Sequence, residues 1–283
     1  MKTEYDFIRY LAAKKSVDDR ALNKDVWRVF AEMMPANPDI LEVGAGIGTM
    51  VERLAAWGAL KRGRYTAVDH NPLTIQTARQ RRQTLPDAIH LTLTAADAFD
   101  SLAQTEQTWD VLIAHAFLDL VDIPSALPQL FSRLQPGGLF YFSLNFDGAT
   151  ILQPEIDPEL DGLIERLYHQ TMDERVVDGR SSGDSHSGRH LFGHIRQAGG
   201  QILAAGSSDW VVFAGANGYP ADEVYFLHFI IHTIEQALSN HPALAQARFA
   251  DWIARRYAQI EAGELVYIAH QIDFLGVTTK NQR

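Results

Sequence analysis

Hydrophobic and polar positions follow two different periods between Asp39 and Leu144. Short runs that are almost wholly apolar predict buried strands, and segments whose apolar residues recur every three or four positions predict helices. We expect strands of this kind at 39–43, 65–69, 109–114 and 139–144, and a further strand at 89–94, where apolar and polar residues alternate. We expect helices between them at 47–57, from Pro72 onward and at 123–134. Strands that alternate with helices in this way form a parallel sheet with helices on both faces.

The segments on either side of this region are more helical. We expect one helix at 18–34, ended by Pro35 and Pro38. After Leu144 the regular alternation stops, and the pattern predicts helices at 157–174, 190–198, 222–238 and 242–260 and extended segments at 201–205, 210–214 and 264–274. The length of 283 residues predicts one large domain or one domain with substantial insertions, and we expect a single domain over residues 1–283.

A glycine-rich turn follows the first predicted strand. Gly44, Gly46 and Gly48 stand at alternate positions, and a helical pattern begins directly after them. Glycine permits positive φ and lets a ligand approach the backbone, while the start of a helix offers open N–H donors to an anionic group. The turn therefore predicts a site for a small ligand. Its third glycine comes one position too early for a dinucleotide fingerprint, and no lysine follows as a P-loop requires.

Polar residues follow the predicted strands at their carboxyl ends, where open parallel sheets bind their ligands. Asp69 follows the second strand, Asp97 the third and His115 the fourth, and Asn145 and Asp147 follow the fifth. Asp69 could accept hydrogen bonds from both hydroxyls of a ribose, and Asp97 could accept one from an adenine amine. Either carboxylate could instead cap the helix that follows it.

The E-x-G-x-G-x-G turn that begins at Glu42 resembles motif I of the class I S-adenosylmethionine-dependent methyltransferases of the small-molecule type. The stretch from Leu134 to Gly138 is similar to the L-x-P-G-G turn of that family. The resemblance implies an α/β fold with a Rossmann-like, doubly wound, mostly parallel seven-stranded sheet, helices on both faces and an antiparallel last strand. The parts that it implies are an N-terminal helical cap at 1–38, a cofactor-binding core at 39–144 and substrate-cover insertions at 145–198 and 214–263.

The same resemblance implies S-adenosyl-L-methionine as the cofactor. The cofactor-binding residues that it implies are Glu42, Gly44, Gly46, Gly48, Asp69, His70, Asp97, Ala98 and His115. The glycines would line the methionine portion, and Glu42 would steady the turn or the ammonium group through water. Asp69 would hold the ribose, His70 would lie beside the adenine, and Asp97 with Ala98 would recognise the adenine edge.

The implied reaction is transfer of a methyl group to an oxygen or nitrogen of a small molecule by in-line displacement. Aligning the acceptor and excluding water supply much of the acceleration. His115 would lie near the sulfonium and is the candidate catalytic residue, and Asp119 is a further candidate if the acceptor must first lose a proton. The residues that position alone suggests for the acceptor are Arg20, Asn145, Tyr168, Arg189 and Tyr219.

Histidines recur every four residues at His186, His190 and His194. On one continuous helix this spacing could bind a metal ion. Gly188 and the serines around it predict a turn that would interrupt such a helix, and no carboxylate completes a ligand set. We therefore expect no metal site here.

The composition argues against a nucleic-acid-binding or membrane protein. Lys and Arg number 25 against 35 Asp and Glu, so the net charge of -10 lacks the basic surface expected for binding nucleic acid or anionic lipid. The chain has no cysteine, and no apolar run approaches the roughly 18 residues of a membrane span. We expect a cytoplasmic enzyme with a small-molecule substrate and with neither a nucleic-acid nor a membrane partner.

Two other functions stay open on this reasoning. A non-catalytic S-adenosylmethionine-binding protein could act through a partner, for example by way of its C-terminal helices. An NAD-dependent oxidoreductase could use the same kind of sheet, although the early third glycine argues against it.

Overall fold

The computed structural model of the chain describes residues 5–177 and 179–279. The strands are β1 (Asp39–Val43), β2 (Gly63–Asp69), β3 (Ile89–Ala95), β4 (Trp109–His115), β5 (Leu134–Gln153), β6 (Val176–Val177), β7 (Arg180–Ser181), β8 (Gly200–Ser207), β9 (Trp210–Val212) and β10 (Val266–Thr278). The α-helices are α1 (Phe7–Ala21), α2 (Lys24–Met33), α3 (Thr49–Ala56), α4 (Pro72–Arg81), α5 (Ala98–Ala103), α6 (Ile123–Phe131), α7 (Pro158–Asp173), α8 (Ser187–Gln197), α9 (Glu223–Leu238) and α10 (Gln246–Glu261). Short 3-10 helices lie at η1 (Arg82–Thr84) and η2 (Leu118–Leu120).

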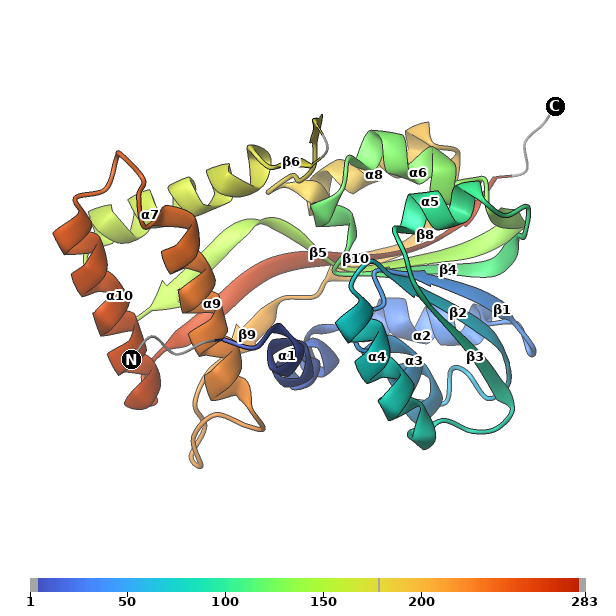
Figure 1. Ribbon diagram of the computed structural model, residues 1–283, viewed down its shortest axis with the longest axis horizontal. Coiled ribbons are helices and arrows are strands. Elements are labelled where there is room, and N and C mark those ends of the chain that lie inside the picture. The colour runs from blue at the N-terminus through green and yellow to red at the C-terminus, as the bar shows by residue number, and fades with distance from the viewer. Residues whose placement is uncertain (1–4, 178, 280–283) are drawn as a thin grey trace.

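The main sheet has the order β3-β2-β1-β4-β5-β10-β8, and β9 pairs with β10 (Figure 1). The pairs from β3 to β5 are parallel, while β10 runs antiparallel to both β5 and β8. This topology confirms the predicted Rossmann-like sheet with an antiparallel last strand. The short strand β9 brings the sheet to eight strands.

Alternate residues of the core strands enter two hydrophobic clusters on opposite faces of the sheet. In β4, Val111 and Ile113 pack with residues of α1, α2 and α3, whereas Leu112 and Ala114 pack with residues of α5, α6 and α8. Because both faces are covered there, residues 111–114 of the central strand β4 are all apolar and buried. Polar side chains therefore gather at the carboxyl ends of the parallel strands, which we call the ligand edge of the sheet.

β5 continues to Gln153, so the strand end that the sequence predicts at Leu144 is wrong. Leu144 has a φ of 57°, and its N–H donates to Oδ1 of Asp273 at 2.8 Å. The pairing register with β10 shifts between Ile272 and Phe274. The irregularity thus bends the strand pair without ending it.

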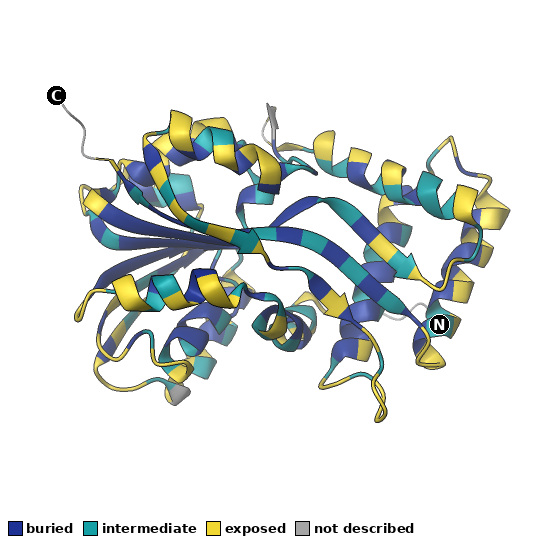
Figure 2. Cartoon of the chain, turned by 180° about the vertical axis from the view of Figure 1, so that it is seen from behind, coloured by how far each residue is buried: buried dark blue, intermediate teal, exposed yellow. Residues whose placement is uncertain are grey.

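Beyond this bend, residues 145–153 of β5, residues 266–272 of β10 and β9 form what we call the β5–β10 extension. Helices α1, α7, α9 and α10 lie around one face of the extension (Figure 1). Seen from behind, the strands lie in front of α9 and α10 (Figure 2). The extension therefore places helical elements beside the ligand edge of the core sheet.

The N-terminal region holds two helices in place of the single helix predicted at 18–34. α1 ends at Ala21, and Asn23 caps α2 by accepting the N–H groups of Asp25 and Val26. The sequence pattern misses α1 because its buried face includes two charged residues, Lys14 and Asp18. Within the described part of the chain, every helix is too short or too polar to cross a membrane.

Candidate functional site

The turn between β1 and α3 consists of glycines in the left-handed region. Gly44, Gly46 and Gly48 have φ values of 69°, 53° and 79°. Gly48 occupies the N-cap of α3 without a side-chain hydrogen bond, so the first turn of this helix has no capping side chain. A Cβ atom at Gly44 would lie 2.4 Å from Cδ2 of Phe117, which packs against this face of the turn. The sequence offered little sign of that contact, because Phe117 follows a different strand.

Asp69 holds the glycine turn from the end of β2. Its Oδ2 accepts the N–H of Gly46 at 2.8 Å, and its Oδ1 accepts the N–H of Asn71 at 2.9 Å and the hydroxyl of Thr74 at 2.8 Å. Asn71, and not Asp69, caps α4. A carboxylate oxygen has two acceptor positions, so Oδ2 keeps one for a ligand. Binding both hydroxyls of a ribose would require Oδ1 to release one of its donors.

Asp97 lies at the end of β3 and caps α5. Oδ1 accepts the N–H groups of Phe99 at 2.8 Å and of Asp100 at 3.0 Å, which leaves Oδ2 free of those contacts. The side chain is exposed, and Ala98 beside it is buried. Capping and ligand binding are therefore compatible at this residue. The side chain of His70 is 84% exposed, with Nδ1 3.8 Å from Oδ1 of Asp69.

Glu42 is buried beneath the turn. The hydroxyl of Tyr65 donates to its Oε2 at 2.8 Å, and burial raises the pKa of Glu42 to about 8. Among the contacts of the described residues, this carboxyl group meets β2 and makes no hydrogen bond to the glycines. Its predicted role toward the turn or the cofactor stays a prediction.

His115 ends β4 inside a buried hydrogen-bond network. Its Nδ1 lies 2.8 Å from Oγ of Ser143, and its Nε2 lies 3.1 Å from Oδ2 of Asp18. Burial lowers the pKa of His115 to about 4, so the ring is neutral and its Nε2–H donates to Asp18. Both ring nitrogens are thus engaged, and in this arrangement His115 positions α1. Its predicted catalytic role stays a prediction.

Asp18 ties α1 to the rest of this network. The Lys14 ammonium lies 2.7 Å from Oδ2, and the indole N–H of Trp210 donates to Oδ1 at 2.9 Å. Burial alone would raise the pKa of Asp18, but Lys14 and His115 together hold it well below its usual range. The sequence could not reveal this network, because Asp18 and His115 are separated by 97 positions.

Further ion pairs fix α1 over the glycine turn. Arg53 of α3 is fully buried, and its Nε donates to Asp19 at 2.6 Å. Arg20 forms a two-pronged pair with buried Glu223, with one nitrogen 2.8 Å from Oε2. Leu11 of the same helix lies 3.6 Å from where a Cβ atom of Gly46 would stand. α1 therefore packs over the turn, and the role of residues 1–38 as a substrate cap stays a prediction.

The residues suggested by position for the acceptor have different surroundings. Arg20 pairs with Glu223, Arg189 donates from Nε to Asp147 at 2.8 Å, and the hydroxyl of Tyr219 donates to the carbonyl of Leu265 at 2.7 Å. These bonds give all three residues structural roles, and their predicted contact with an acceptor stays untested.

The other two acceptor candidates keep polar atoms free. Asn145 is buried and donates to the carbonyl of Ile272 at 2.8 Å, while its Oδ1 has no partner. The Tyr168 hydroxyl has no hydrogen-bond partner in the described part of the chain. Tyr168 packs against the hydrophobic cluster to which Ala13 and Val17 of α1 belong.

The turn that the sequence predicts in the histidine stripe lies at Ser185 and His186, and α8 begins directly after it at Ser187. Gly188 itself is helical, whereas His186 is the N-cap, so of the three histidines His190 and His194 lie on the helix. The ring centroids of His186 and His190 are 6.2 Å apart, and those of His190 and His194 are 6.3 Å apart. Two carboxylates also lie close to His186.

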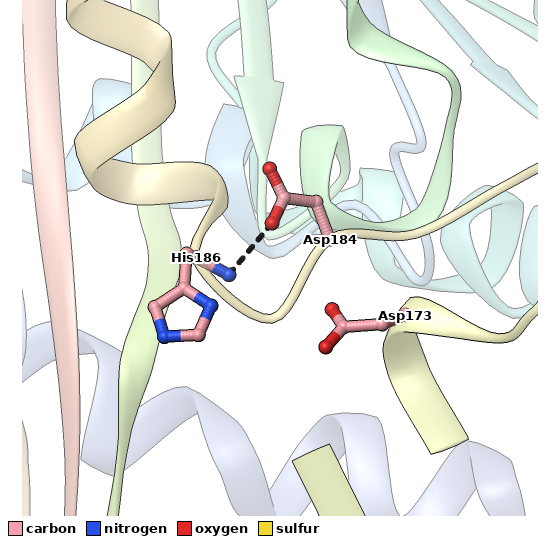
Figure 3. Close-up of side chains that lie close together, drawn as sticks. All are labelled: Asp173, Asp184 and His186. Carbon is pink, nitrogen blue, oxygen red and sulfur yellow. Dashed lines mark hydrogen bonds between the residues drawn. The ribbon is translucent and has the colours of Figure 1, made fainter. Parts of the chain in front are cut away.

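Asp173, Asp184 and His186 place candidate ligand atoms within 4.8 Å of one another (Figure 3). Hydrogen bonds within the protein already use these groups. Asp173 accepts the N–H of Ser185 at 2.7 Å and its hydroxyl at 3.1 Å, and Asp184 accepts the N–H of His186 at 2.8 Å and faces Nδ1 of His190 at 2.6 Å. The contacts explain the grouping as the connection between α7 and α8. Because two carboxylates lie close to His186, the prediction that no carboxylate completes a ligand set with the histidines is wrong.

The comparisons with known proteins address the core of the chain. Residues 40–138 match a family model described as a methyltransferase domain. Comparison with curated proteins finds no match. The chain is similar to a solved structure from Bacillus halodurans assigned as a methyltransferase, with a TM-score of 0.56 and 11% identity over 91% of this chain and 100% of that chain. It is also similar to an S-adenosylmethionine-dependent methyltransferase of Methanosarcina mazei, with a TM-score of 0.49 and 11% identity over 89% of this chain and 98% of that chain.

At such low identity the Bacillus halodurans structure supports the fold alone. The family match covers the segment from β1 to the turn within β5, which carries the glycine turn, Asp69, Asp97 and His115.

Proposed function

We propose that this chain is a class I S-adenosylmethionine-dependent methyltransferase that transfers the methyl group of its cofactor to an oxygen or nitrogen of a small molecule. The match of residues 40–138 to a methyltransferase domain supports the proposal, and the Bacillus halodurans structure supports the fold. The observation that carries the proposal is the pairing of the left-handed glycine turn with Asp69, whose Oδ2 lies 2.8 Å from the N–H of Gly46 and keeps a free acceptor position.

The residues of the site fit the cofactor in charge and shape. Gly44, Gly46 and Gly48 would hold its methionine portion, since a side chain at this turn would be strained and at Gly44 would collide with Phe117. Asp69 would take a ribose hydroxyl, and the free Oδ2 of Asp97 would take the adenine amine. The bound cofactor supplies an electrophilic methyl group on a sulfonium, so the protein needs to orient the acceptor and exclude water.

Two elements support the exclusion of water. α1 covers Gly46 through Leu11, and Phe117 covers Gly44. The network of His115, Asp18 and Lys14 holds α1 in this place. A closed site of this kind favours an acceptor small enough to be enclosed, and the net charge of -10 favours no large anionic partner.

The proposal is tested by measuring release of S-adenosylhomocysteine from the full chain in the presence of S-adenosylmethionine and a panel of small amines, phenols and carboxylic acids. Acceptor-dependent release is the expected result. Saturable cofactor binding without release for any acceptor class would favour a non-catalytic binding protein. Tight binding of NAD with no binding of S-adenosylmethionine, measured by calorimetry, would overturn the assignment.

A further inference from the structure

Four polar side chains beside the proposed cofactor site have no hydrogen-bond partner in the described part of the chain. They are Tyr10 of α1, Asp119 of η2, Tyr168 of α7 and Tyr267 of β10. Tyr267 is only 4% exposed, but among these four side chains of the described chain the buried polar atom without a partner is Oδ1 of Asp119. A buried acceptor without a partner is costly to a fold, so this oxygen indicates a ligand that supplies the missing donor.

Ring contacts with Phe226 connect Tyr10 with Tyr267 of the β5–β10 extension. The Tyr10 ring stacks on Phe229 with centroids 4.0 Å apart and on Phe226 at 5.8 Å. The Tyr267 ring lies 6.0 Å from Phe226. Helices α1 and α7, which carry Tyr10 and Tyr168, lie around the same face of the extension (Figure 1).

Asp119 and Tyr168 lie near enough to Tyr10 to act on it electrostatically. Burial raises the pKa of Tyr10 well above its usual range, and Tyr267, Asp18, Tyr168 and Asp119 raise it further. Burial raises the pKa of Tyr168 to about 12, and Asp119 adds to that effect. We call these four residues the tyrosine–Asp119 cluster.

The cluster adjoins the place where the methyl group would be presented. Asp119 follows Phe117 by two positions, and Phe117 packs on Gly44. Tyr10 shares α1 with Asp18, which binds His115 at the end of β4. The cluster therefore lies between the cofactor residues and the helices of the extension.

Two cations lie near Asp119, and neither neutralises it by direct contact. Burial raises the pKa of Asp119, whereas Arg175 and Lys14 lower it. Lys14 is committed to Asp18 at 2.7 Å. Arg175 makes no ion pair within the described part of the chain. Asp119 thus remains a carboxylate that lacks a bound donor among aromatic rings.

We propose that the tyrosine–Asp119 cluster is the acceptor site and that the acceptor is a small amine, whose ammonium donates to Asp119 and lies against the tyrosine rings. This inference rests on the proposed function. An ammonium supplies charge-assisted donors to a carboxylate and is attracted to aromatic faces, so it satisfies both features of the cluster. An alcohol supplies one neutral donor, and a carboxylate is repelled.

The test compares benzylamine with benzyl alcohol, which differ in the ammonium group alone. Each probe is titrated by calorimetry or NMR into the full chain, with and without S-adenosylhomocysteine. We expect the wild type to bind the amine about tenfold more tightly than the alcohol. Asp119→Asn is expected to abolish this preference and to leave the affinity for the alcohol unchanged.

A matched control comes from the same loop. Asp122 accepts a hydrogen bond from Ser125 and lies outside the cluster, so Asp122→Asn is expected to keep the preference for the amine. If Asp119→Asn does not fold, as judged by circular dichroism, Tyr168→Leu with Tyr267→Leu replaces it, because leucine removes the aromatic faces, and it is expected to reduce the preference at least threefold.

Equal affinity of the wild type for both probes, or an unchanged preference in the cluster variants, would overturn the inference. Loss of the preference in Asp122→Asn as well would also overturn it, because the effect would then reflect general surface charge. Amine preference without any binding of S-adenosylhomocysteine would support the cluster and count against the proposed function alone.

Discussion

At the scale of single residues, the carboxylates of the site differ in whether a donor within the protein binds them. Asp69 accepts three donors, and Glu42 accepts the hydroxyl of Tyr65. Asp119 has no such donor. The first two hold the sheet edge in shape, and the third is left for an acceptor.

Asp69→Ala is expected to weaken S-adenosylmethionine binding at least tenfold. The variant loses the free acceptor position of Oδ2 and also the hydrogen bond that fixes Gly46, and hydrogen bonds to charged groups are worth about 1.5–3 kcal/mol each. Isothermal titration calorimetry measures the change. Asp25→Ala, at a side chain 93% exposed, is the control and should bind as the wild type does. Unchanged affinity in Asp69→Ala would remove the ribose role.

Glu42→Gln is expected to change how stability depends on pH. Burial raises the pKa of Glu42 from 4.5 to about 8, so between these values the native state holds a proton that the unfolded state has lost. The stability that the neutral carboxyl provides is therefore complete below about pH 4.5 and is lost as the pH rises through about 8.

Glutamine removes this titration. Between pH 4.5 and about 8, the free energy of unfolding of the variant should therefore rise relative to that of the wild type by up to about 1.4 kcal/mol per pH unit. Denaturant unfolding at pH 5, 6.5 and 8 measures the difference. Glu32→Gln, at a side chain 62% exposed, should show no such trend. A pH-independent difference for Glu42→Gln would show that the carboxyl is ionised in the fold.

At the scale of elements, the glycine turn and α1 act together. The turn gives the backbone its shape, and α1 lies over it through Leu11 and is tied to α3 by the pair of Asp19 with Arg53. The shape of the turn and the attachment of α1 depend on different residues, so substitutions can test each of them separately.

Gly44→Ala is expected to destabilise the chain more than Gly58→Ala and to abolish cofactor binding. Both glycines have positive φ, 69° and 78°, and alanine there costs about 1–2 kcal/mol. A Cβ at Gly44 also meets Phe117 at 2.4 Å, whereas one at Gly58 has nothing within 4 Å. Thermal unfolding should rank the variants in this order. Adding Phe117→Ala to Gly44→Ala should recover part of the loss, and equal destabilisation by the two single variants would refute the close contact.

Glu223→Ala is expected to loosen α1 by about 1–3 kcal/mol, because the fully buried carboxylate accepts from Ser16 and from Arg20, which is itself partly exposed. The neighbouring Asp222 pairs with Arg9, but both side chains are about half exposed, so Asp222→Ala should cost less than about 1 kcal/mol. Hydrogen exchange of α1 amides reports the loosening directly. Equal protection of α1 in both variants would mean that Glu223 does not hold this helix.

At the scale of the whole molecule, the sequence predicts those elements whose determining residues are close together in the chain. The strands from β1 to β4, their helices and the glycine turn are readable because their signals lie within a few residues. The full length of β5 is not readable, since Asp147 and Gly148 look like a turn and the support at Leu144 comes from Asp273, 129 positions away.

The residues of the candidate site likewise fall into those that the local sequence predicts and those that it does not. Residues at strand ends, such as Asp69 and Asp97, follow from sheet geometry. The partners of His115, the cover by α1 and the grouping of Tyr10 with Tyr267 depend on contacts between distant segments. The apolar periodicity of α1 is hard to recognise in the sequence, because the buried face of this helix includes the charged residues Lys14 and Asp18.

A crystal structure of the full chain with S-adenosylhomocysteine tests the central claim most directly. We predict that the homocysteine portion lies on the turn from Gly44 to Gly48, that a ribose hydroxyl meets Oδ2 of Asp69 and that the adenine lies beside Asp97. An adenosyl group bound at any other place on the chain would contradict the account.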